Sequence, residues 1–214
     1  MKRLFALLTL LLAGCSSQPS LPDFTASGYL ADRGAVRIWR KNHQDSVHML
    51  TVFKPFQEGA TVFTRYGWQD GNLISIERHL KDARPDDVTL RFDGDGSLSF
   101  MQRQLAGRRE AVSEQAVELY KFDAQRMLKI SDALLAGRVL LKQGRWQGND
   151  TLQTCQGEQV KPTLDESEWR RIEQVQHQTG AKVSVAWLEA PAGTQLLEVS
   201  TEDDCQWEPQ EADF

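Results

Sequence analysis

Hydrophobic and polar side chains alternate with a period of two through residues 26–103. Val36 and Ile38, for example, alternate with Arg37 and Trp39. Further strand-like segments lie at 47–52, 61–66, 73–76, 88–92 and 98–100. The turn sequences QDGN and DGDG separate two pairs of these segments, and strands joined by Asp-Gly turns are typical of β-hairpins. The pattern predicts an antiparallel meander of five or six strands.

The hydrophobic spacing changes from two to three or four after Ser113. The residues that follow this spacing are Val117, Tyr120, Ala124, Met127, Leu128, Ser131, Leu134 and Leu135. Such spacing predicts an amphipathic helix over 114–136, capped by Ser113 and ended by Gly137. We expect this helix to cover the concave side of the sheet, with Leu128 near the middle of the contact, because its apolar stripe has to be buried.

The remaining third of the chain predicts a strand over 139–146, a second helix and a hairpin. Asp165 with Glu168 three positions later has the form of a capping box, and Gly180 is a suitable helix end. Residues 182–188 and 196–200 form the expected hairpin. The acidic residues 208–214 are expected to be a frayed tail.

Together these segments predict an α+β fold that is mainly antiparallel β. We expect a curved meander sheet or a partly open barrel covered by one long helix, followed by a C-terminal helix and β-hairpin. A chain of 214 residues can bury one substantial core, so residues 26–207 are expected to form a single domain.

The N-terminal residues have the features of a bacterial secretion signal. Lys2 and Arg3 precede an apolar run of about 10 residues, which is too short to cross a bilayer as a helix. The sequence Leu-Ala-Gly-Cys that ends at Cys15 resembles the lipobox of bacterial lipoproteins. That resemblance implies that residues 1–14 are removed and that the Cys15 thiol carries a lipid. Several long acyl chains would hold such a protein on a membrane almost permanently.

Residues 15–25 are then expected to be a lipidated tether rich in Ser, Gln and Pro. Ser16 and Ser17 follow the cysteine, with no Asp directly after it. By resemblance to the sorting rule of enteric bacteria, this favours a periplasm-facing position on the outer membrane over the inner membrane.

Charge and cysteine content narrow the function classes further. The formal net charge is −5, and it becomes more negative once Lys2 and Arg3 are removed, which argues against a nucleic-acid partner. Cys155 and Cys205 remain as a pair in a chain expected to reach an oxidising compartment, so we predict a structural disulfide between them. The alternative is a redox pair or a thiolate metal site, although neither cysteine belongs to a C-x-x-C motif.

No motif for catalysis or for a metal stands out in the sequence. DGDGS at 93–97 resembles the start of a calcium loop, but Leu98 and Gln104 occupy the positions where an EF-hand needs Gly and Glu. His43 and His48 could meet across a hairpin, but no two histidines have zinc-motif spacing, so we expect them to be histidines on strand surfaces. Nucleophile motifs are absent, and the adjacent acids at 86–87 and 203–204 are expected to point apart. We therefore expect neither an enzyme nor a cofactor.

Two further groups of residues can be explained either by a structural role or by ligand binding. Arg103, Arg108 and Arg109 form a basic cluster that would suit a lipid phosphate or a negatively charged partner, but we favour a solvated loop balanced by nearby glutamates. Four tryptophans lie in expected strands, where they fill a core more often than they line a pocket: Trp39, Trp68, Trp146 and Trp187.

The whole chain resembles the uncharacterised gammaproteobacterial lipoproteins typified by YjaH, in its lipobox near residue 15, its length, and its strands followed by a helix and a C-terminal hairpin. This family has no established activity, so the resemblance implies no catalytic residues. The segment ASGYLADRGAVRIWRKN at 26–42 and the strands and helix after it are similar in layout to the LolB/LolA carriers, which are unclosed β-barrels with a helical lid.

The sequence therefore favours a non-enzymatic outer-membrane lipoprotein that binds an envelope protein partner or supports the envelope. The alternative is a carrier of a lipid or a small apolar ligand, and an inhibitor of an envelope hydrolase is a weaker third. A sheet filled by the helix over 114–136 would support the first role, and a wide apolar hollow would support the carrier. The ligand-binding residues are not defined by the sequence.

Overall fold

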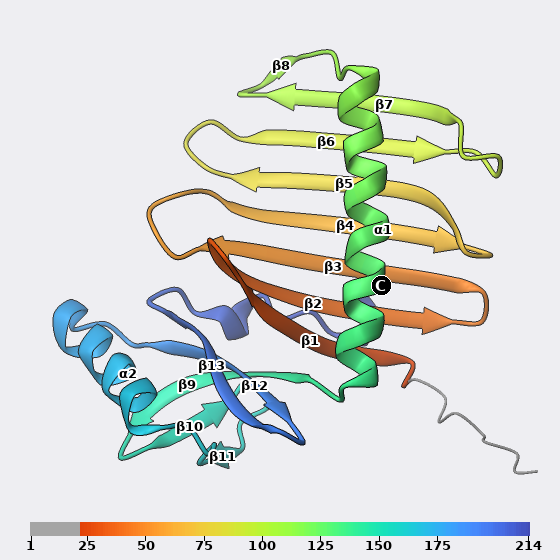
Figure 1. Cartoon of the computed structure of the whole chain (residues 1–214). Coiled ribbons are helices and arrows are strands. Elements are labelled where there is room, and N and C mark those ends of the chain that lie inside the picture. The colour runs from red at the N-terminus through yellow and green to blue at the C-terminus, as the bar shows by residue number, and fades with distance from the viewer. Residues whose placement is uncertain (1–21) are drawn as a thin grey trace, which may run out of the picture.

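The computed structural model describes residues 22–214 as two antiparallel sheets with two α-helices, which confirms the expected α+β class (Figure 1). The expected signal peptide at 1–14 and the lipidated Cys15 lie outside the described residues. Neither helix among the described residues is long and apolar enough to cross a membrane.

The first sheet is a meander in which every strand pairs with the next one in sequence. Its eight strands are β1 (Phe24–Ala31), β2 (Gly34–His43), β3 (Ser46–Pro55), β4 (Thr61–Gln69), β5 (Asn72–Lys81), β6 (Asp86–Phe92), β7 (Leu98–Leu105) and β8 (Arg108–Arg109). This is more than the five or six that were predicted. The first strand begins two residues before the expected domain start, and it lacks clear alternation because side chains on both of its faces are buried.

Helix α1 (Glu114–Ala136) crosses the strands of this sheet on one face, from the β7 end towards the β1 end (Figure 1). Both predicted ends are confirmed, since the Ser113 hydroxyl accepts a hydrogen bond from the Ala116 N–H and Gly137 is the C-cap. The centre of the contact is Ala124 and Met127, which are 0% and 4% exposed. Leu128 is only half-buried, so the expectation that it lies at the middle is wrong.

The second sheet lies at the β1 end of the first (Figure 1). Its strand order is β11 (Gln159–Val160), β10 (Thr151–Thr154), β9 (Leu140–Gly148), β12 (Ser184–Ala190) and β13 (Gly193–Ser200). Helix α2 (Glu166–Thr179) packs on it through the fully buried Ile172. The predicted capping box of Asp165 and Glu168 is present, and Gly180 ends α2 with a left-handed φ of 63°.

Apolar side chains join the two sheets on the face of the first sheet opposite α1. Trp39 and Val52 of the first sheet belong to one buried cluster with Leu188 and Leu197 of the second. A Cβ on Gly28 would lie 2.7 Å from the Val36 carbonyl oxygen of the neighbouring strand β2, and 3.2 Å from the Leu197 side chain of the second sheet. A glycine is therefore required at position 28.

All four tryptophans of the predicted strands belong to the core, as expected. Trp39, Trp68 and Trp187 are each 1% exposed, and Trp146 is 8% exposed. Trp68 lies in the cluster beneath α1, whereas Trp146 and Trp187 lie in the cluster between the second sheet and α2.

The last residues of the chain differ from the frayed tail that the sequence suggests. They form two short 3₁₀ turns, η1 (Asp204–Gln206) and η2 (Glu211–Asp213). The Phe214 ring lies 5.6 Å from the Phe24 ring, and the Lys41 ammonium donates to the Phe214 backbone oxygen. The acidic composition of this segment suggested fraying, but the Phe214 side chain packs on Phe24 and holds the segment against the first sheet.

The burial pattern of α1 leads to a stability prediction. We expect Met127→Ala to lower the free energy of unfolding by about 2–5 kcal/mol, because it removes buried surface and leaves a cavity between helix and sheet. Lys129→Ala, on the exposed side of the same turn, should change it by less than about 0.5 kcal/mol. Urea unfolding of both variants measures the difference. Equal, small effects would mean that α1 is a loosely held lid and not a fixed cover.

Candidate ligand-binding groove

A groove of about 520 Å³ runs beside α1 on the face of the first sheet that this helix covers. It exists because α1 covers only part of that face. All three tyrosines of the chain line it, namely Tyr29 from β1, Tyr66 from β4 and Tyr120 from α1. Its volume lies in the range of small-molecule sites in proteins.

The floor of the groove consists of two rows of cross-strand neighbours. Val36, Phe53 and Val62 are paired in register across β2, β3 and β4, and they form an apolar row. The adjacent row is polar and consists of Thr51, Thr64 and Arg78. Because side chains alternate between faces along each strand, both rows point towards the α1 side. The floor thus offers an apolar strip beside a strip of hydrogen-bonding groups.

The wall of the groove comes from α1 and carries a hydrogen-bonded chain of polar groups. The Tyr66 hydroxyl donates to Asp123 Oδ2 at 3.2 Å, and Arg126 Nη2 donates to Asp123 Oδ1 at 2.7 Å. Burial, reinforced by the Asp123 charge, raises the pKa of Tyr66, and burial also raises the pKa of Tyr29. Both phenols therefore keep their protons and can act as hydrogen-bond donors.

The charges that line the groove balance one another. Asp32 and Asp123 contribute two carboxylates, and Arg78 and Arg126 contribute two guanidinium groups. No charge of one sign dominates, so the groove has no preference for a strongly charged ligand. With an apolar strip and several donors, it suits an amphipathic molecule.

The predicted basic cluster does not form a phosphate site. Arg103 donates to both carboxylate oxygens of Asp86, at 2.8 and 3.0 Å, and these hydrogen bonds lower the pKa of Asp86. Arg108 and Arg109 lie exposed on the short strand β8. The three side chains are thus divided between an ion pair and solvent.

The structure separates the histidines and the paired acids. His43 lies opposite Ser46 in the β2–β3 hairpin, while His48 lies opposite Lys41, so the two histidines are not cross-strand partners. Asp86 faces Arg103, whereas Asp87 is ion-paired with His79 on the other face of the sheet, as expected for adjacent acids on a strand.

The DGDGS segment forms the turn between β6 and β7. The Gly96 N–H donates to the Asp93 carbonyl oxygen, and the Ser97 N–H donates to Asp95 Oδ1 at 2.9 Å. Among residues 22–214, no three His, Cys, Asp or Glu side chains come together in a way that would hold a metal ion.

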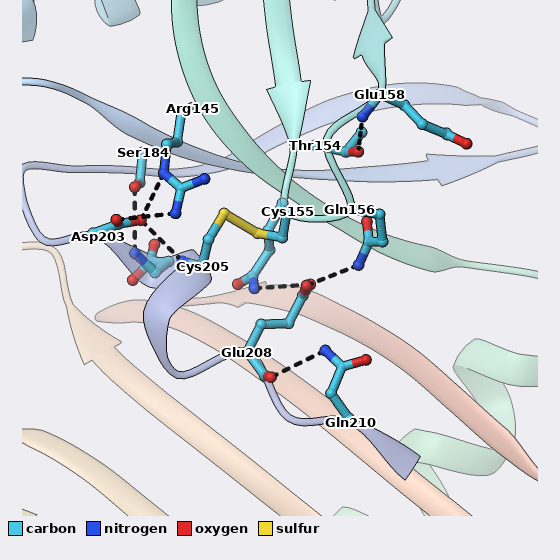
Figure 2. The surroundings of a disulfide bond; sticks show 12 residues. Arg145, Thr154, Cys155, Gln156, Glu158, Ser184, Asp203, Cys205, Glu208 and Gln210 are labelled. Atoms are coloured by element: carbon cyan, nitrogen blue, oxygen red, sulfur yellow. Dashed lines mark hydrogen bonds and ion pairs between the residues drawn. A yellow bond between two sulfur atoms is a disulfide. The ribbon is translucent and has the colours of Figure 1, made fainter. Parts of the chain in front are cut away.

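Cys155 and Cys205 are joined by a disulfide, as the cysteine count predicts (Figure 2). This bond attaches the C-terminal segment to the loop after β10. Hydrogen bonds on both sides support the attachment, since Arg145 donates to both carboxylate oxygens of Asp203 and Gln156 donates to Glu208 (Figure 2). On the chain-entropy model, a cross-link across about 50 residues stabilises a fold by about 4 kcal/mol.

A buried charge network that the sequence did not reveal lies beside the disulfide, between the two sheets. Arg37 of β2 is 1% exposed, and its guanidinium lies 3.1 Å from Asp204 Oδ2 and 3.4 Å from Glu198 Oε2. It also donates to Gln143 Oε1 and stacks 4.6 Å from the Trp207 ring. The partners come from β9, β13 and η1, so one side chain connects segments far apart in sequence.

The acids of this region are held away from solvent. Burial raises the pKa of Asp204; Arg37 and Lys54 oppose the shift, and Glu198 adds to it. Burial also raises the pKa of Glu208, despite hydrogen bonds from Gln143 and Gln156. The network fits a structural role, because its groups face one another and none of them lines the groove.

The raised pKa of Asp204 gives a pH prediction. An acid whose pKa is higher in the folded state binds its proton more tightly there, so its contribution to stability falls as pH rises above the ordinary value of 3.8. We expect Asp204→Asn to gain stability relative to the wild type as the pH rises above about 4. Urea unfolding of both proteins at each pH measures this. A variant that loses stability relative to the wild type over the same interval would contradict it.

Comparison with known proteins relates this fold to one family. Residues 26–210 match the family model described as a protein of unknown function, DUF1481. The chain is 47% identical to the uncharacterized protein YjaH of Escherichia coli strain K12 over 206 residues, which cover 96% of this chain and 89% of that protein. No solved structure matches the chain significantly. The chain belongs to the DUF1481 family.

Proposed function

We propose that this protein is a non-enzymatic lipoprotein of the bacterial envelope that binds a small amphipathic molecule in the groove beside α1. It is held on the periplasmic side of the outer membrane by acyl chains on Cys15. The lipobox sequence before Cys15 supports the anchor, and the groove supports the binding function. The ligand belongs to the class of lipids or small apolar molecules with a polar end.

The observation that carries the binding function is the pairing of an apolar row with a polar row on the groove floor. Phe53 and Val62 are half-buried and can cover an apolar chain or ring. Thr64 and Arg78 stand beside them and can donate to hydroxyl or carbonyl oxygens, and the Tyr66 hydroxyl, which donates to Asp123, can accept from a ligand hydroxyl. Burial of apolar surface supplies affinity for such a ligand, and the polar groups fix its orientation.

The way α1 is packed favours binding in a groove with a fixed wall. Its buried stripe joins the core of the first sheet, and the Ser113 cap fixes its start. A ligand enters from the open side of the groove, without lifting the helix. This differs from a carrier with a movable lid, in which the helix must separate from the sheet at low cost.

Binding of an envelope protein partner is the second candidate function. Leu119 and Phe122 favour it, because they are 66% and 65% exposed on the side of α1 that faces away from the sheet. Large apolar side chains that stay exposed together commonly mark interaction surfaces.

The anchor is tested by Cys15→Ser. We expect this variant to remain an unprocessed precursor without acyl chains, because the thiol at the cleavage site is the acceptor of the lipid. Metabolic labelling with a radioactive fatty acid and membrane fractionation measure the loss. Ser16→Ala is the control and should be processed normally. A Cys15→Ser protein that is still cleaved and labelled would show that the anchor is assigned wrongly.

The groove is tested by filling it. We expect the full-length protein, purified gently from membranes, to carry a small molecule that native mass spectrometry detects as added mass. Val62→Trp places an indole on the groove floor and should abolish the added mass, whereas Lys129→Trp on the exposed side of α1 should retain it. A wild-type protein free of any small molecule, or a Val62→Trp protein that still carries one, would contradict the groove. Co-purification of a protein in place of a small molecule would favour the second candidate.

A further inference from the structure

A second cavity, of about 400 Å³, lies on the opposite face of the first sheet. The side chains of β4, β5 and β6 form its floor, and the C-terminal segment forms one wall through Trp207, Pro209 and Asp213. It is separate from the groove beside α1, because the sheet lies between them. The proposed function makes no use of it.

The wall of this cavity is aromatic and firmly placed. Trp207 lies edge-on to Phe63, with 5.6 Å between the ring centroids, and edge-on to Trp39 at 5.7 Å. The disulfide at Cys205 holds the chain two residues before Trp207. Pro209 is buried next to it. The indole, the phenyl ring and the proline therefore form a rigid apolar platform at the edge of the cavity.

The floor beyond this platform carries charged and polar side chains in two rows. Arg65, Glu77 and Thr89 are paired in register across β4, β5 and β6. The neighbouring row has Phe63, His79 and Asp87 in register. The cavity is lined by three carboxylates, from Glu77, Asp87 and Asp213, and by the guanidinium groups of Arg65 and Arg78, so the rim presents donors and acceptors with a small excess of negative charge.

His79 is oriented by its neighbour. Its Nδ1 is bonded to the Asp87 carboxylate, and its ring lies 6.5 Å from the Phe63 ring. A carboxylate on Nδ1 fixes the orientation of the imidazole, and no hydrogen bond to Nε2 is present among the described residues. Nε2 is therefore available to a ligand beside the aromatic platform.

We propose that this cavity binds a neutral polyhydroxylated ring, that is, one sugar unit of a glycan. The hydroxyl groups of a sugar both donate and accept hydrogen bonds, which matches a rim that carries guanidinium, carboxylate and imidazole groups. The apolar C–H face of the sugar ring packs on one of the two aromatic rings, because Phe63 and Trp207 lie nearly perpendicular and Arg37 stacks on one face of Trp207. An anionic ligand fits less well, because the carboxylates of Glu77, Asp87 and Asp213 repel it at close range.

The test is a titration of the full-length protein with neutral oligosaccharides, followed by saturation-transfer NMR. The probes are chitotriose, cellotriose and maltotriose, with spermidine and a hyaluronan tetrasaccharide as the cationic and anionic comparisons. We expect at least one neutral trisaccharide to bind and to receive saturation on the C–H face of one ring. Asp87→Asn should weaken that binding on the order of tenfold, because it replaces one carboxylate oxygen of the rim by an NH2 donor and removes the charge that holds His79 Nδ1.

His43→Ala is the matched control, since His43 is exposed at the β2–β3 turn and outside the cavity, and it should bind the sugar as the wild type does. Trp207→Leu should abolish binding while the protein stays folded by circular dichroism. If Trp207→Leu unfolds the protein, the Asp87→Asn comparison decides. Binding of spermidine or hyaluronan in preference to all neutral sugars, no binding of any probe, or equal binding by Asp87→Asn and wild type would each overturn the assignment.

Discussion

The buried guanidinium of Arg37 fixes how the two halves of this protein fit together. It comes from the second strand of the first sheet, and its partners come from the second sheet and from the C-terminal segment. Burying a cation at the centre of an interface costs free energy, and acids compensate that cost only when they lie at well-defined positions around the cation. The position of β13, the turn η1 and the Trp207 ring all follow from that requirement. The disulfide at Cys205 then needs only to hold the segment that Asp204 has already oriented.

The two faces of the first sheet are covered by different parts of the chain. One face packs on α1, and the other packs on the second sheet near β1 and on the C-terminal segment near β4. Neither cover spans its whole face, and each leaves a cavity beside it. A helix is about 10 Å wide, whereas strands of eight to ten residues are about three times as long, so one helix across the strands cannot cover them fully. The groove beside α1 is thus a direct result of covering a broad sheet with a single helix.

Local signals in the sequence predicted most of the elements, and contacts between distant segments explain what was missed. The caps Ser113 and Asp165 and the left-handed Gly180 act within one helical turn, so sequence alone places the ends of α1 and α2 well. The disulfide was predicted because Cys155 and Cys205 are the two cysteines that remain once Cys15 is assigned to the lipid. By contrast, the sequence pattern around Arg37 predicts only a solvent-facing position on a strand. Its role in joining the two sheets depends on Glu198 and Asp204, which are far away in the sequence. Met127 and not Leu128 centres the helix contact because the crossing direction of α1 decides between two adjacent apolar residues. The groove was not predictable, since its rows come from three strands and its wall from a helix.

The strand order of the first sheet also dictates a sequence of assembly. Because each strand pairs with the one before it, the meander can form progressively from contacts that are close along the chain, which is the arrangement that folds quickly. The face of β1 to β3 that carries Arg37 and Trp39 is different, because its cover is supplied by residues 139–214. That face stays exposed to water until the second sheet and the C-terminal segment arrive. A molecule cut short before Leu140 would therefore have a complete first sheet with an uncovered apolar surface and an unpaired arginine at its centre, and it would be prone to associate with other chains.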